Sequence, residues 1–70
     1  MNISEKTALL KKLIRDMKGA GHDALLNDLI LLSAIAEMKM SGKHTNGLDE
    51  LETKIDDAIK ILNSINQLKS

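Results

Sequence analysis

The sequence predicts an all-α protein: an antiparallel helical hairpin, coiled-coil-like, preceded by a short N-terminal helix. Proline and valine are absent, whereas Leu, Ile, Lys, Glu and Ala are abundant, and this composition favours helix along nearly the whole chain. Two apolar runs step by three and four residues on either side of a glycine-bearing break, a spacing typical of helices packed side by side. With 70 residues, the chain is expected to form a single helical domain over 1–70.

The first helix is predicted over about 4–18, with Ser4 as its N-cap. Its apolar positions fall on one stripe, which is expected to face the core: Leu10, Leu13, Ile14 and Met17. The segment Gly19-Ala20-Gly21 follows. Two glycines in three residues disfavour a helix interior and readily supply a C-terminal cap, so the helix should end or kink here.

The second helix is predicted over about 23–40, with Asp23 as its N-cap and Gly42 as its stop. Helical periodicity gives it two apolar stripes on nearly opposite sides. The first is expected to face the third helix and contains Leu25, Leu29, Leu32, Ala36 and Met40. The second contains Leu31, Ala34, Ile35 and Met38. This helix therefore has two faces to bury.

The third helix is predicted over about 49–68, after a turn at 41–48 that is short enough to make the two long helices antiparallel neighbours. Asp49 and Glu52 have the spacing of a capping box at its start. Its inward seam is Leu48, Leu51, Ile55, Ala58, Leu62 and Ile65. Ile61 and Leu68 fall off this seam and form a smaller apolar patch.

The residues that could carry chemistry give no catalytic, cofactor or metal site. His22 and His44 lie beside glycine-bearing turns without a companion at metal-ligand spacing, so they are interpreted as turn residues. Asp56 and Asp57 are adjacent on a helix and point about 100° apart, so they are interpreted as part of a solvated face rather than as an acid–base pair. The chain also has no cysteine and no aromatic residue. We therefore expect a protein that is not an enzyme.

Charge and hydropathy disfavour nucleic acid and membranes as partners. Ten basic and ten acidic residues give no net charge, and the most apolar run, 29–36, contains Ser33 and is far too short to span a bilayer. One basic cluster lies on the first helix and contains Lys11, Lys12, Arg15 and Lys18. Glu5 and Asp16 on the same helix reduce its positive charge, and no aromatic residue could stack on bases. The cluster is therefore interpreted as a solvated helix face. A soluble cytoplasmic protein is expected.

The surplus apolar surface is the strongest functional indication. The second stripe of the second helix could be core beneath the first helix, or it could be a contact surface for a partner helix or helical repeat, where methionine adapts well to an irregular surface. The first helix could also cover the stripe and then yield it to a partner. The predicted partner-binding residues are Leu31, Ala34, Ile35, Met38, Ile61 and Leu68.

The stretch 25–68 resembles the small co-chaperones of the type III secretion needle subunit, the E component of that virulence-associated apparatus. The likeness consists of a chain of about this length, an antiparallel hairpin, the turn at Ser41-Gly42 and the string Ala58-Ile59-Lys60-Ile61-Leu62. Leu48 stands where members of the family carry an aromatic residue.

The resemblance implies a non-catalytic protein of the bacterial cytoplasm that pairs with a larger helical-repeat chaperone. Together the two would keep the needle subunit monomeric before export, with a homo-oligomer possible when the small protein is alone. Two alternatives stay open. One is a phage- or plasmid-type regulator that binds DNA or a protein, and the other is a self-assembling helical hairpin, because the same stripe could pair with its own copy.

Overall fold

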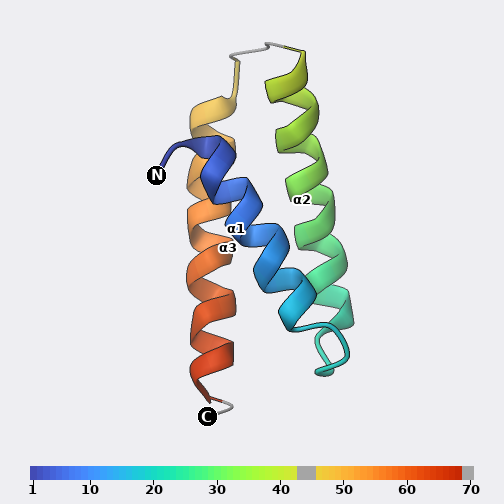
Figure 1. Cartoon of the computed structure of the whole chain (residues 1–70). Coiled ribbons are helices and arrows are strands. Elements are labelled where there is room, and N and C mark those ends of the chain that lie inside the picture. Colours follow the sequence, from blue (N-terminus) through green and yellow to red (C-terminus); the bar gives the residue numbers. More distant parts are fainter. Residues whose placement is uncertain (43–45, 69–70) are drawn as a thin grey trace.

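The computed structural model describes residues 1–42 and 46–68, and within these ranges it contains three α-helices and no strand. They are α1 (Ile3–Asp16), α2 (Asp23–Ser41) and α3 (Leu48–Leu68). Figure 1 shows α2 and α3 side by side and antiparallel, with α1 lying obliquely across both. The all-α prediction with a hairpin after a short first helix is confirmed. The predicted turn residues 43–45, including His44, lie outside the described residues.

The first helix begins earlier than predicted because Asn2, and not Ser4, is its N-cap. The Asn2 side chain accepts a hydrogen bond from the Glu5 backbone N–H at 2.8 Å, and the Glu5 carboxylate accepts one from the Asn2 N–H at 3.2 Å. This reciprocal pair is a capping box. The helix ends before Gly19 and Gly21, whose φ angles of +84° and +91° lie in the left-handed region that favours glycine. The predicted end at this segment is therefore confirmed.

The other two N-cap predictions are wrong. His22 occupies the N-cap position of α2 without a side-chain cap hydrogen bond, and Asp23 is the first helical residue. Because α3 begins at Leu48, Asp49 lies inside the first turn. The Glu52 carboxylate accepts a hydrogen bond from the Lys6 side chain of α1. A tertiary contact has replaced the local one that the sequence pattern suggested.

The core lies between all three helices. Its buried cluster contains Leu10, Ile14, Met17, Leu26, Leu29, Ala36, Ile55, Ala58 and Leu62. The predicted inward stripes of α1 and α3 are confirmed, with Leu13, Leu48 and Ile65 only partly buried. On α2 the predicted seam is only partly correct, because Leu29 and Ala36 are buried but Leu25, Leu32 and Met40 are partly exposed. Leu26 and Ser33 are buried in addition.

The packing of α1 explains this rotation of the buried face of α2. The first helix packs on α2 and on α3 more extensively than these two pack on each other. The buried face of α2 must therefore serve two neighbours, and it turns toward Leu26 and Ser33. Ser33 tolerates burial because its hydroxyl donates to the Ile30 carbonyl at 2.8 Å, and buried Thr7 donates likewise to Ile3.

Ion pairs join α1 to both partner helices. The Lys6 Nζ lies 2.7 Å from Glu52 Oε2 and 3.1 Å from Asp56 Oδ2 of α3. The Lys11 Nζ lies 2.8 Å from Glu37 Oε1 of α2. The sequence suggested that Asp56 belongs to a solvated face. In the structure Asp56 also holds an ion pair with α1. Hydrogen bonds from Lys6 to Glu52 and then to Asp56 raise the pKa of the Lys6 ammonium above its ordinary value of 10.5.

We predict that Lys6→Met lowers the thermal midpoint at neutral pH, because it leaves two carboxylates of α3 without their cation. A raised pKa in the fold means that Lys6 stabilises it fully below the ordinary value of 10.5, and that this contribution is lost as the pH rises through the raised pKa. Thermal melts from pH 7 upward should therefore show the two proteins converging at strongly alkaline pH. Exposed Lys12→Met is the control, and an equal effect of both substitutions would contradict the role of the ion pairs.

Burial on α3 predicts a large contrast between two identical substitutions. Leu62 is 0% exposed, whereas Leu68 is 87% exposed. Leu62→Ala should reduce the free energy of unfolding by roughly 2–5 kcal/mol, because it leaves a cavity in the core. Leu68→Ala should change it by less than about 0.5 kcal/mol. Urea unfolding followed by circular dichroism measures both, and similar losses would contradict the described core.

Candidate functional site

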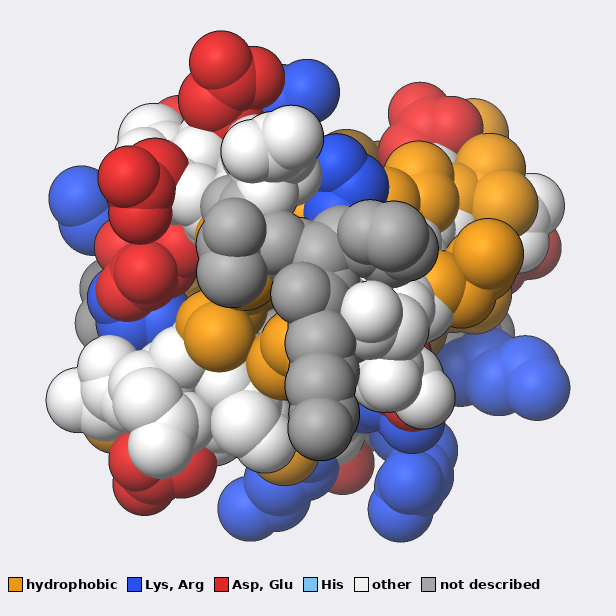
Figure 2. All heavy atoms as spheres, turned by 90° about the horizontal axis from the view of Figure 1, so that it is seen from above, with side chains coloured by type: hydrophobic (Ala, Val, Ile, Leu, Met, Phe, Trp, Pro, Cys, Tyr) orange, Lys and Arg blue, Asp and Glu red, His pale blue; other side chains and the backbone are white. Residues whose placement is uncertain are grey.

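The candidate site is a line of exposed apolar side chains on α2, which we call the α2 stripe: Leu31, Ala34, Ile35 and Met38. The three large side chains are 63% (Leu31), 46% (Ile35) and 73% (Met38) exposed, and Ala34 is also exposed. At about 100° per residue these positions lie opposite the buried positions of the same helix. Figure 2 shows a group of hydrophobic side chains on the α2 side of the molecule, at the right of the view.

The sequence of α2 makes this exposure unavoidable. From Leu29 to Ala36, every residue except Ser33 is apolar, so whichever face enters the core leaves apolar side chains on the other. The prediction that the stripe might be core beneath α1 is wrong, because α1 packs on the side of α2 that carries Leu26 and Ser33. The stripe is thus free in the isolated chain, and a surface of this kind is a candidate for binding another protein.

Charged residues border the stripe along one edge. Helical periodicity places Asp28 and Lys39 on the same flank, near opposite ends of the stripe. Asp28 is exposed and Lys39 is half-buried, with its Nζ donating to the Asn46 carbonyl at 3.1 Å. On the other flank Ile30 is 47% exposed and extends the apolar surface toward α1. The stripe therefore has one edge marked by Asp28 and Lys39 and a second edge on which apolar Ile30 lies with Glu37.

Beyond Ile30 lies an open groove of about 510 Å³ between α1 and α2. Apolar residues Ile14, Leu26 and Ile30 contribute to its lining, together with three cationic side chains of α1, Lys11, Arg15 and Lys18. These three are exposed, as a solvated face requires, but they also border an apolar hollow. Sequence reasoning missed the groove because it depends on the angle at which α1 crosses α2.

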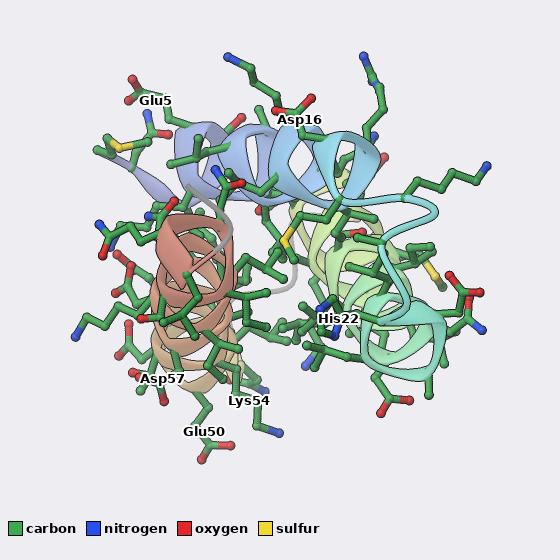
Figure 3. All side chains as sticks on the ribbon, turned by 90° about the horizontal axis from the view of Figure 1, so that it is seen from below. Glu5, Asp16, His22, Glu50, Lys54 and Asp57 are labelled. Carbon is green, nitrogen blue, oxygen red and sulfur yellow. The ribbon has the colours of Figure 1, made fainter. Side chains whose placement is uncertain are left out.

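The remaining predicted site residues lie elsewhere. Ile61 and Leu68 are exposed, but they belong to α3, so the predicted set is divided between two helices. His22 is half-buried at the start of α2, and Figure 3 shows it near the end of the hairpin. Figure 3 also shows Glu50, Lys54 and Asp57 pointing outward from α3. Among the described residues, no group of three or more carboxylate or imidazole side chains is placed to hold a metal ion.

Comparisons of the chain with protein-family models, with curated proteins and with solved structures give no match. Within 1–42 and 46–68, none of the helices combines the length and the apolar character that crossing a bilayer requires. The exposed surface of α2 is therefore the feature of the molecule that points to a function.

We predict that charges are tolerated on the stripe but not on the opposite face of the same helix. Leu31→Asp with Ile35→Asp should retain helicity and change the free energy of unfolding by no more than about 1 kcal/mol, because both side chains already contact solvent. Leu29→Asp should unfold the protein, because it buries an unpaired carboxylate. Circular dichroism distinguishes these outcomes. Unfolding of the double variant would show that the stripe is covered within the chain.

Proposed function

We propose that the protein is a non-catalytic interaction module whose docking surface is the α2 stripe. The observation that supports this most directly is the division of α2 into two apolar faces, one packed on α1 and α3 and the other exposed. The backbone of a helix that its neighbours already hold in place needs no ordering on binding, so only the side chains of its apolar face lose freedom. Docking then costs little conformational entropy.

The spacing of the stripe indicates the kind of partner. Side chains at 31, 34, 35 and 38 recur every three or four residues, the pattern by which one helix binds in a groove between helices or on a helical repeat. Met38 is the most exposed member of the stripe, and its unbranched thioether can adapt to an irregular partner surface. A helical partner with an apolar groove is therefore the best match.

Within this class, we favour a co-chaperone of type III secretion that stabilises a larger helical-repeat chaperone and helps to keep the needle subunit monomeric before export. This assignment rests on the resemblance of 25–68 to the E component and on the exposed stripe, which would be buried against the larger chaperone. A location in the bacterial cytoplasm belongs to the same proposal.

A DNA-binding regulator is a weaker candidate. If α2 were its recognition helix, Asp23, Asp28 and Glu37 would face a phosphate backbone with Lys39 as the helix's one cation. The exposed cations of α1 border a groove that is lined in part by apolar Ile14, Leu26 and Ile30, and a phosphate backbone does not match such an apolar lining. A salt-dependent gel shift with the wild-type protein would revive this alternative.

The proposed function predicts that a tagged wild-type protein co-purifies with a helical-repeat protein from its native host. Leu31→Asp with Ile35→Asp should abolish this co-purification, because binding would bury two unpaired carboxylates. The matched control, Asn63→Asp with Asn66→Asp, places two new charges on exposed positions of α3 outside the predicted partner-binding residues and should retain the partner. Retention of the partner by the folded double variant would contradict the docking surface, and so would the absence of any helical-repeat partner.

A further inference from the structure

The two charges beside the α2 stripe have an arrangement that suits one particular partner. Asp28 and Lys39 lie on the same flank of α2, eleven residues apart, with the stripe running between their levels. When two copies of a helix pair antiparallel about a twofold axis, each flank meets the same flank of the other copy. Asp28 of one copy then lies at the level of Lys39 of the other, provided that the axis passes near residue 33.

The apolar side chains also fit an antiparallel alignment. Leu31 of one copy lies opposite Ile35 of the other when the axis passes at residue 33. The Asp28–Lys39 pair is centred half a residue further along the helix, so both pairs fit one antiparallel alignment to within that offset. The apolar contacts and the charges of the surface both favour an antiparallel alignment with its axis near residue 33.

We propose that the free protein pairs with a second copy of itself through an antiparallel α2–α2 contact centred at residue 33. The inference rests on the proposed function only in treating the stripe as a binding surface, and it does not require the larger chaperone. In this state the protein would cover its own apolar face, and a helical partner would have to displace the second copy.

A parallel pair fits the same surface poorly. It would set the flank that carries Asp28 against the opposite flank of the other copy, where the α2 residues are Asp23, Ile30 and Glu37 and the cations of α1 lie beyond Ile30, across the groove. Lys39 would meet Glu37, but that carboxylate already pairs with Lys11 at 2.8 Å. The antiparallel arrangement instead gives both charged residues a partner of opposite sign.

The charged pair is expected to fix orientation more than affinity. Lys39 would exchange its hydrogen bond to the neutral Asn46 carbonyl for one to a carboxylate. Ion pairs at a solvated edge contribute little to stability but disfavour wrong alignments. Because the stripe is small, we expect a weak dimer that exchanges rapidly and yields readily to a larger helical partner.

Sedimentation equilibrium of the purified protein up to about 1 mM tests the pairing. The wild type should dimerise, and Asp28→Lys or Lys39→Asp alone should weaken dimerisation by about tenfold, because each makes two like-charge contacts per dimer. The double variant Asp28→Lys with Lys39→Asp should restore it. Asp57→Lys on α3 alters the net charge as Asp28→Lys does and should have no such effect.

Disulfide trapping tests the orientation, because the chain contains no cysteine of its own. The two single variants Leu31→Cys and Ile35→Cys are mixed and oxidised. The antiparallel register predicts that most disulfides form between one variant and the other. Predominance of disulfides between identical variants would overturn the antiparallel register. A strictly monomeric wild type, or a double charge variant without recovery, would overturn the self-pairing. These assays contain no chaperone, so their failure is distinguishable from a failure of co-purification.

Discussion

The structure depends on the position of α1 against the hairpin. Two helices alone would bury one seam each, and that seam would have to supply the whole core. With α1 lying across them, α2 and α3 each pack on two neighbours, and Leu10, Ile14 and Met17 enter the same cluster as Ile55 and Leu62. Lys6 and Lys11 fix α1 to the two other helices by ion pairs at its polar margins. The helix α1 is therefore part of the core and not an appendage of the hairpin.

The same contact decides which surface is left for binding. Because α1 and α3 both pack on α2, they determine its buried face, and the residues on the opposite side become the stripe. A chain of this size buries a smaller fraction of its surface than a larger domain does, yet it leaves the apolar side chains of Leu31, Ile35 and Met38 exposed to solvent. Covering these side chains would stabilise the protein without any change in its fold. This gain is available equally from a helical partner and from a second copy, so both proposals draw on one physical cause.

The helices and the inward faces of α1 and α3 could be predicted from the sequence, because periodicity is a local property. The two stripes of α2 could also be recognised. The sequence could not show which of them would remain exposed, because that depends on the face of α2 on which α1 packs. The caps were harder. Asn2 with Glu5 has capping-box spacing and forms the cap in place of the predicted Ser4, whereas Asp49 with Glu52 has the same spacing and forms no such box. Glu52 instead reaches Lys6, 46 positions away, and no local pattern indicates such a contact. The α1–α2 groove escaped prediction for the same reason, because it depends on a crossing angle.

The central claim is that α1 completes the core while the α2 stripe stays open, and paramagnetic broadening of methyl signals by a soluble probe tests it most directly. At a concentration low enough to keep the protein monomeric, the methyl groups of Leu31, Ile35 and Met38 should broaden strongly, whereas those of Leu29 and Ala36 on the opposite face should be protected. Equal protection of both faces would show that α1 or another segment covers the stripe. That result would contradict the account.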